Sequence, residues 1–304
     1  MKSRSVSQIV KEISSLRIQG AQNIAKASLE AINFVVHSSH ASSVVQFRKE
    51  ISKASDSLIK ARATEPLLRN YMKAVKASSQ TSSLRESKEK VLATLADLTK
   101  YHGQAKVEIT DIAQQKILKG SLIFTHCHSS TVTSAIIAAH KNKKRVTVAN
   151  AEARPKYQGR ITARELSDEG IMVHHMVDSA AGKAIKKADI MFIGADAITS
   201  YAVINKIGSS LFAQIAHQYD VPVYICAHAL KFDPDTLFGK SEPIEERDAK
   251  EVWDKPPKNV HIHNPAFDEV EQEHITGIIS ELGVFPLPAF IEEVRRQYPW
   301  IFEK

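Results

Sequence analysis

The residues best suited to chemistry are a cysteine and an aspartate, each placed just after a short apolar run. Cys127 lies within residues 125–131, Thr-His-Cys-His-Ser-Ser-Thr, which precede an alanine-rich segment with helical spacing. Free backbone amides at a helix start favour negative charge, so a thiol there is expected to have a pKa below its unperturbed value of about 8.5. The alternative is that Cys127 is a small buried apolar residue, as lone cysteines commonly are.

Asp196 follows the apolar run 190–193, in the sequence Gly-Ala-Asp-Ala-Ile-Thr. A carboxyl group beside large apolar residues is a candidate for a raised pKa, and such a group can donate a proton near neutrality. Asp196 is equally suited to a turn or a helix cap, where aspartate is common. With opposite displacements of their pKa values, Cys127 and Asp196 would make an acid–base pair.

Other apolar runs are followed by polar and cationic residues that suit phosphate binding. Ser129 and Ser130 are suited to cap a helix or, with free backbone amides, to bind a phosphate group. Asn205 and Lys206 are predicted to enter a helix, where Lys206 would contact a phosphate or lie on the surface. Further cations at such positions are Arg154, Lys156 and Lys231. Together they suggest a pocket for an anionic, phosphorylated small molecule.

The pattern His126-Cys127-His128 also offers potential metal ligands. In a strand, the two histidines would point one way and the cysteine the other, and no second spaced pair of cysteines or histidines completes a zinc set. The sequence has neither a GxGxxG nor a Walker phosphate loop. We therefore predict no metal site and no cofactor.

The elements that must position these residues change in type near residue 110. Before it, apolar residues such as Ile9, Ile13 and Ile24 follow the 3.6-residue repeat of a helix, and the Ser/Thr-rich stretch 78–83 supplies helix caps. After residue 120, short apolar runs alternate with helical segments. The runs are 122–124, 146–148, 171–177, 190–193, 221–225 and 260–262. The helical segments are 131–141, 160–168, 179–187, 205–219, 269–282 and 287–297.

This alternation predicts a mostly parallel sheet covered by helices, in which ligands bind beyond the carboxyl ends of the strands. We predict an α/β protein with a helical domain over residues 1–110 and a Rossmann-like parallel-sheet domain over residues 111–304.

Composition and charge limit the class of protein. The chain has 304 residues, of which 43% are hydrophobic and 25% charged, and these values are typical of a folded protein. Two cysteines exclude a disulfide framework and indicate a reducing compartment. No apolar run approaches the roughly 18–20 residues of a membrane helix, and no signal-peptide pattern is seen. We expect a cytoplasmic protein without a membrane partner.

The net charge of +7 comes from the first 110 residues, which hold 18 Lys+Arg and 9 Asp+Glu. This excess is either an ordinary solvated helical surface or a basic face for an anionic partner such as a nucleotide, nucleic acid or phosphorylated metabolite.

As a set, several motifs resemble one superfamily. It comprises the regulatory alpha, beta and delta subunits of the guanine-nucleotide exchange factor for translation initiation (initiation factor 2B), 5-methylthioribose-1-phosphate isomerases and ribose-1,5-bisphosphate isomerases. The motifs are THCHSST (125–131), EARPKYQGRITARELSDEGI (152–171), VDSAAG (177–182), GADAIT (194–199), VINKIG (203–208), KFDP (231–234), ERD (246–248) and NPAFD (264–268). The flanking segment 153–171 looks most similar to the ribose-1,5-bisphosphate isomerases.

This resemblance implies an aldose–ketose isomerase with Cys127 as the base and Asp196 as the acid. It also implies a set of substrate contacts: Gly20, Ala21, Arg62, Ser129, Ser130, Asn205, Lys206 and Lys231. Members of the superfamily associate as dimers and often as hexamers, so a homo-oligomer is expected. The basic N-terminal half then plausibly serves sugar phosphates, and nucleic acid is not an expected partner.

The chain departs from the isomerase pattern at Gln19, Ala63 and His228, where arginine, proline and glutamate are usual. Its Ser-Ser-Thr at 129–131 also resembles the translation-type relatives. A non-catalytic regulatory subunit related to the alpha subunit, binding a nucleotide or a sugar phosphate, is therefore the alternative. A neighbouring gene for RuBisCO or AMP phosphorylase would favour the enzyme.

Overall fold

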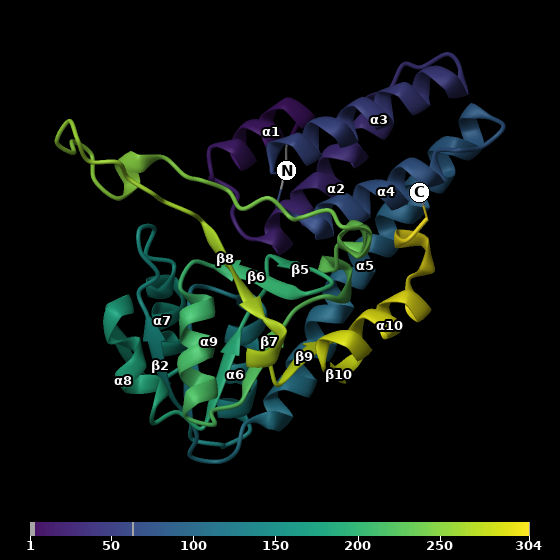
Figure 1. Cartoon of the computed structure of the whole chain (residues 1–304). Coiled ribbons are helices and arrows are strands. Elements are labelled where there is room, and N and C mark those ends of the chain that lie inside the picture. Colours follow the sequence, from purple (N-terminus) through teal and green to yellow (C-terminus); the bar gives the residue numbers. More distant parts are fainter. Residues whose placement is uncertain (1–3, 63, 304) are drawn as a thin grey trace.

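The N-terminal part of the chain is a bundle of helices, as its apolar periodicity predicts (Figure 1). The computed structural model describes residues 4–62 and 64–303, so Ala63 lies outside the described residues. The helices are α1 (Val6–Ser14), α2 (Ala21–Ser38), α3 (Val44–Ala61), α4 (Pro66–Ser78) and α5 (Leu84–Lys116). The side chains of Ser5, Ser43 and Ser83 accept hydrogen bonds from backbone amides at the starts of α1, α3 and α5.

The second part is built on a sheet with the strand order β10-β9-β7-β4-β1-β2-β3. Its strands are β1 (Leu122–Thr125), β2 (Thr147–Ala151), β3 (Met172–Met176), β4 (Ile190–Ile193), β7 (Val223–Cys226), β9 (Gly277–Ser280) and β10 (Gly283–Phe285). The pairs are parallel except that β10 runs antiparallel to β9. A smaller antiparallel sheet joins β5 (Ala197–Ile198), β6 (Ala202–Lys206) and β8 (Phe267–Glu271). The predicted α/β class with a mostly parallel sheet is confirmed.

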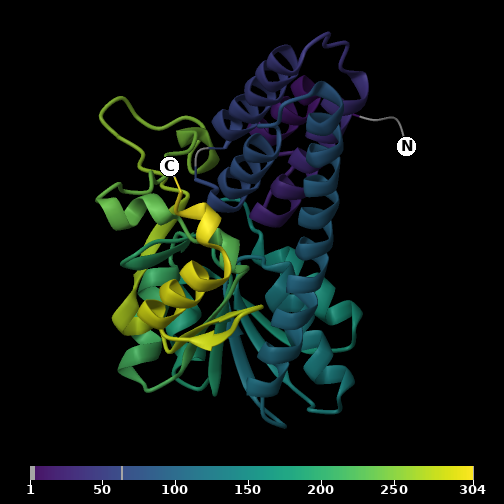
Figure 2. The ribbon, with the colours of Figure 1, turned by 90° about the vertical axis from the view of Figure 1, so that its right-hand side faces the viewer.

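Helices cover both faces of the large sheet (Figures 1 and 2). They are α6 (Ser130–Lys141), α7 (Gly159–Asp168), α8 (Ala181–Ile185), α9 (Ser209–Gln218) and α10 (Leu287–Gln297). Neighbouring residues along a strand point to opposite faces. Accordingly, Ile123 of β1 shares one apolar cluster with residues of α5, α6 and α7, whereas Phe124 belongs to a second cluster with residues of α8, α9 and α10. That second cluster continues into the helical bundle.

Helix α5 runs without interruption through residue 110, where the sequence pattern changes. Its early residues Val91 and Leu95 pack in the core of the bundle, and its later residues Ile109 and Ala113 pack against the sheet. The helix thus spans both parts of the molecule (Figure 2). The division into domains at residue 110 stays a prediction. None of the helices in residues 4–62 and 64–303 is long and apolar enough to cross a membrane.

Three predicted elements are wrong. The segment 269–282, expected to be a helix, contains the end of β8 and the whole of β9, whose Ile278 and Ile279 are buried. The segment 205–219 becomes helical only at Ser209, because residues 202–206 form the middle strand of the small sheet. The run 260–262 forms no strand but lies in the long connection between β7 and β8, where Val260 is exposed.

Candidate functional site

A cavity of about 430 Å³ opens at the carboxyl ends of β1 and β4. These two strands are neighbours in the sheet. From β1 the chain adds β2 and β3 on one side of β1, and it then crosses over to add β4 on the other side, so the direction of strand addition reverses between β1 and β4. Such a reversal leaves a crevice between the strand ends, which is the usual ligand site of open α/β sheets. The cavity is lined by all ten residues that the family resemblance implies for the site: Gly20, Ala21, Arg62, Cys127, Ser129, Ser130, Asp196, Asn205, Lys206 and Lys231. Their individual roles stay predictions.

Cys127 lies in the turn between β1 and α6, with a left-handed backbone at φ 61°. This conformation is unusual for a residue with a side chain and is common at functional sites. The hydroxyl group of Thr162 on α7 holds the turn by donating to the Cys127 carbonyl oxygen at 2.9 Å.

The electrostatics of Cys127 correct one expectation. Burial raises the pKa of its thiol to about 11, and this effect exceeds the opposing influence of the Lys206 cation. The expected pKa below 8.5 is therefore wrong, and the thiol is neutral at pH 7. Cys226, in contrast, is 1% exposed and packs in the core under α5 and α6.

The start of α6 forms one wall of the cavity. The Ser129 hydroxyl caps this helix by accepting from the Val132 amide at 3.4 Å. Gly194, after β4, lies so close that a β-carbon there would be 2.9 Å from the Ser129 Oγ. Glycine at this position therefore allows the ends of β1 and β4 to approach each other.

Gln22 of α2 is a cavity residue that the sequence did not single out. Its amide nitrogen donates to the Thr131 Oγ1 at 2.7 Å and to the His228 Nε2 at 3.0 Å, and its amide oxygen accepts from Ser130 at 3.1 Å. Gln22 thus ties the start of α2 to the start of α6. It also contacts His228, the position where the isomerase pattern has glutamate.

Asp196 follows β4 and lies in the cavity wall, where its backbone amide donates to the Ile204 carbonyl of β6 at 2.9 Å. Behind it, the buried Lys231, in the short helix η2 (Ala229–Lys231), donates to the Ala195 carbonyl. Burial lowers the pKa of Lys231, although Asp196 and Glu65 oppose this shift. Lys231 is thus a cation held beside the predicted acid.

Lys206 does not lie at a helix start, as the sequence predicted, but at the end of strand β6. The start of α9 has another partner, because the Asp268 carboxylate accepts from the Gly208 and Ser210 amides at 2.7 and 3.2 Å. The Lys206 ammonium group instead lies 5.2 Å from the centre of the Phe267 ring, and the Arg62 guanidinium lies 5.6 Å from the same ring. Phe267 therefore orients two of the predicted phosphate-binding cations.

Glutamates of residues 245–251 pair with cations that line the cavity. Glu245 accepts from Arg62 at 2.8 Å and from Arg247 at 3.1 Å. Glu251 forms ion pairs with Arg247 and with Lys156, whose Nζ lies 2.8 Å from the Glu251 Oε1. Arg247 and Phe267 were missed as site residues although they lie within the quoted motifs ERD and NPAFD. Arg154 does not line the cavity and donates instead to the Tyr157 hydroxyl at 2.9 Å.

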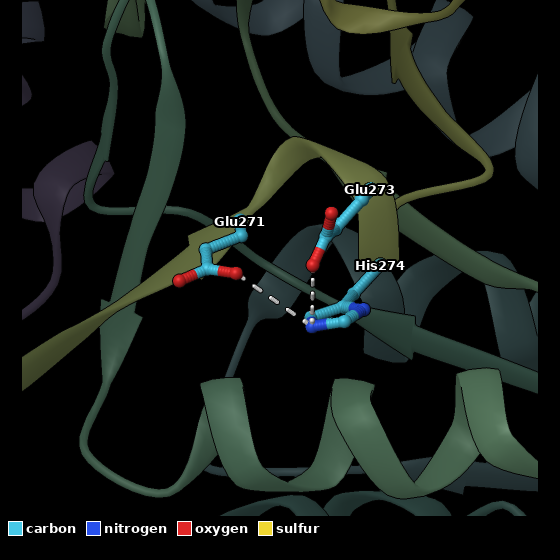
Figure 3. Close-up of side chains that lie close together, drawn as sticks. All are labelled: Glu271, Glu273 and His274. Carbon is cyan, nitrogen blue, oxygen red and sulfur yellow. Dashed lines mark ion pairs between the residues drawn. The ribbon is translucent and has the colours of Figure 1, made fainter.

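The histidines beside Cys127 have other partners. His126 Nε2 lies 2.9 Å from the Ile207 carbonyl oxygen, and His128 Nδ1 lies 3.1 Å from the Thr162 hydroxyl. Within the described chain, the group whose spacing could suit a metal ion is Glu271, Glu273 and His274 (Figure 3), and none of these lines the cavity. The two carboxylates are exposed and lie 3.8 and 3.6 Å from His274 Nε2, as in ordinary surface ion pairs.

Comparisons with known proteins agree with this architecture. A ribose 1,5-bisphosphate isomerase from Pyrococcus furiosus is 36% identical over 311 residues, covering 99% of this chain and 96% of the relative. The crystal structure of a translation initiation factor eIF-2B from Pyrococcus horikoshii superposes with a TM-score of 0.82 at 30% identity, covering 93% of this chain and 98% of that one.

The 5-methylthioribose 1-phosphate isomerase of Pyrococcus horikoshii superposes with a TM-score of 0.77 at 25% identity, covering 96% of this chain and 88% of that one. The family model for the initiation factor 2 subunit family matches residues 17–287. These matches confirm the resemblance that the motifs indicate, and the chain belongs to the initiation factor 2 subunit family.

Proposed function

We propose that the protein is an intramolecular oxidoreductase, an aldose–ketose isomerase that converts ribose 1,5-bisphosphate to ribulose 1,5-bisphosphate. The observation that carries this proposal is the convergence of a thiol, a carboxyl group and several cations in one cavity at the end of β1 and β4. The name of the isomerase relative from Pyrococcus furiosus supports this choice of substrate.

The proposed reaction opens the sugar ring and moves one proton between carbons. Asp196 gives its proton to the ring oxygen as the bond from that oxygen to C1 breaks. Cys127 first loses its thiol proton to solvent, and the resulting thiolate removes the proton from C2, which leaves an enol between C1 and C2. The C2 hydroxyl then returns a proton to Asp196 while the Cys127 thiol delivers a proton to C1. Asp196 and the Cys127 thiolate end in their starting states, as catalysts must.

The cavity has two sets of groups suited to the two phosphates. One is the start of α2, where Gly20 has a φ of 80° and no side chain caps the first backbone amides. The other is the start of α6, next to Cys127. Helix starts bind phosphate through their free amides and the helix dipole. Arg62, Lys206 and Lys231 add positive charge to the same space.

The direct test is to incubate the purified protein with ribose 1,5-bisphosphate and to measure ribulose 1,5-bisphosphate. We expect turnover by the wild type and by Cys226→Ser, because Cys226 is a core residue. We expect loss of turnover in Cys127→Ser and Asp196→Asn. The proposal fails if the wild type is inactive or if Cys127→Ser keeps full activity.

A regulatory subunit is the second candidate, and the Gln22 contacts favour it. The Gln22 side chain uses the hydroxyls of Ser130 and Thr131 at the start of α6, which reduces the groups free to bind a phosphate there. Such a subunit would bind a nucleotide or a sugar phosphate without turnover. Co-purification with translation initiation factor 2, together with the absence of isomerase activity, would support this function.

We also propose that the protein works as a homo-oligomer, a dimer or a hexamer, in the cytoplasm. The support is its family membership, since the resemblance to this superfamily implies a dimer or a hexamer. The mass of the particle in solution, measured by light scattering after size-exclusion chromatography, tests this. A monomer at micromolar concentration would contradict it.

A further inference from the structure

Glu65 is a buried carboxyl group for which the proposed reaction has no use. It precedes α4, and its side chain does not cap that helix. The residue is 1% exposed, and neither carboxylate oxygen has a hydrogen-bond partner within the described chain. Glu65 forms a long ion pair with Arg62, whose Nε lies 3.8 Å from the Glu65 Oε1.

An ionised carboxylate in this position is costly. A buried charge is stable only when it is paired and hydrogen-bonded, and Glu65 has no hydrogen-bond partner among the described residues. The charged groups around it are the cations Arg62, Arg69 and Lys231 and the carboxylate Asp196. Burial raises the pKa of Glu65 to about 8, and Asp196 adds to this shift whenever it is ionised, although the cations oppose it. Glu65 therefore carries a proton at neutral pH.

Two of the cations that interact with Glu65 also line the cavity. Arg62 and Lys231 line the space proposed for the phosphorylated ligand, and both also influence the charge of Glu65. An ionised Glu65 would therefore compete with a bound anion for the same positive charge. A protonated Glu65 leaves that charge to the ligand.

Glu245, the other glutamate beside Arg62, is a natural comparison. Its side chain is 32% exposed, so an arriving anion can displace it into water. Glu65 is enclosed and cannot leave in this way. Glu65 can instead take up a proton, and this removes the negative charge that attracts the cations.

We propose that Glu65 is a positioning residue that couples anion binding in the cavity to a proton: the site takes a phosphorylated ligand with Glu65 protonated and with Arg62 and Lys231 directed to the ligand. The proton comes from solvent when the ligand binds to the ionised form, and it returns to solvent on release. This inference rests on the proposed function in that it takes the ligand to be a phosphorylated anion.

The experiment uses sulfate, a dianion that has no titration near neutrality, as the probe. Its dissociation constant is measured by calorimetry at pH 7, 8 and 9. Because an ionised Glu65 must be protonated before sulfate binds, we expect the affinity of the wild type for sulfate to fall about tenfold between pH 7 and pH 9. Glu65→Gln mimics the protonated carboxyl group, so we expect its binding to vary much less over this range.

Glu245→Gln is the matched control. It removes the exposed glutamate from Arg62, so we expect tighter sulfate binding at every pH with the wild-type pH dependence retained. A second measurement needs no variant: binding heats of the wild type at pH 8, compared in buffers of different ionisation enthalpy, should show proton uptake.

The inference is overturned if wild-type binding takes up no proton at pH 8, or if Glu65→Gln keeps the wild-type pH dependence. It is also overturned if wild-type protein binds no sulfate, and this result would contradict the phosphorylated substrate as well. Proton-linked sulfate binding without turnover of ribose 1,5-bisphosphate would contradict the isomerase alone.

Discussion

At the scale of single residues, the site combines a neutral thiol with cations that already have partners. Cys127 has a strained backbone and a pKa raised by burial, and Lys206 is the charge that favours its thiolate. Arg62 lies between a glutamate and the Phe267 ring. Ligand binding must therefore exchange existing contacts for new ones, and it must bring negative charge close to the thiol without blocking proton transfer.

The raised pKa of Cys127 predicts how the thiol reacts as pH changes. Only the thiolate reacts with iodoacetamide, so we expect the alkylation rate to rise about tenfold per pH unit from pH 7 to pH 9. Mass spectrometry of the digested protein identifies the modified cysteine, and the buried Cys226 serves as the internal control. A rate that is already constant above pH 7 would show that the thiolate is the resting form.

Phe267 is predicted to set affinity for the phosphorylated ligand. Phe267→Leu keeps an apolar side chain but removes the aromatic face beside Arg62 and Lys206. Cation–π contacts contribute about 0.5–2 kcal/mol, so we expect KM for the sugar phosphate to rise about three- to tenfold with a smaller effect on kcat. Tyr219→Leu, which removes the ring beside Lys186 outside the cavity, should leave KM unchanged. Equal effects of the two variants would contradict this role.

At the scale of elements, the position of the Cys127 turn depends on α7. Thr162 on this helix binds the Cys127 carbonyl, and Gly159 begins the helix against the end of β2. The Asn150 side chain of β2 donates to the Gly159 carbonyl at 2.7 Å. The close approach of α7 to β2 is thus a condition for the geometry of the site.

Gly159→Ala tests this approach. A β-carbon at Gly159 would lie 1.9 Å from the Ala151 carbonyl oxygen, so α7 must shift. We expect a loss of about 1–3 kcal/mol in the free energy of unfolding, measured with urea, and reduced isomerase activity. Gly103→Ala in α5 is the matched control, because a β-carbon there meets no atom within 4 Å. It should stabilise the protein by about 1 kcal/mol. Unchanged stability in Gly159→Ala would contradict the close packing.

Local sequence patterns predicted most of the elements around the site, and two of the three failures concern strands that were predicted to be helical. Strands β1, β2 and β4 are short apolar runs between helical segments, so their pattern is visible locally. In contrast, β6 and β9 each pair on one side with a short neighbouring strand and on the other with β8 and β7, which are distant in sequence. All four residues of β9 are buried, so apolar and polar positions do not alternate along it. Periodicity alone does not distinguish such a run from a buried helix.

The same distinction holds for the site residues. The ten residues that the resemblance implies for the site meet in one cavity. Gln22 and Glu65 were missed because their importance depends on partners more than 100 residues away, such as Thr131 and Lys231. The pKa of Cys127 was mispredicted because a helix start is visible in a sequence, whereas the degree of burial is not.

At the scale of the whole molecule, the helical part is fixed to the sheet part by buried polar contacts. Asn70 of α4 donates to the Leu230 and Phe232 carbonyls at 2.8 and 2.9 Å. Beside it, Arg69 binds Asp233 at 3.0 Å and Glu242 at 2.6 Å. These contacts hold Arg62 and Gly20 of the helical part against the cavity.

Arg69→Ala is predicted to weaken this interface strongly. The substitution leaves the buried carboxylates of Asp233 and Glu242 without their shared cation, and breaking a buried ion pair costs about 3–5 kcal/mol. The free energy of unfolding, measured with urea, should fall by this amount. Arg85→Ala is the control, because it removes an exposed pair with Glu89 and should cause no measurable change. Similar losses in the two variants would argue against a role for the buried cluster.

The continuity of α5 limits how the cavity can open. The helix has 33 residues and is therefore about 50 Å long, and it carries core residues of both parts. A hinge at residue 110 would have to break its backbone hydrogen bonds, so the two walls of the cavity move as one rigid body. We therefore expect a ligand to enter without separation of the two parts. For the same reason, cutting the chain at residue 110 would expose Ile109 and Ala113 and would leave neither fragment with an intact core.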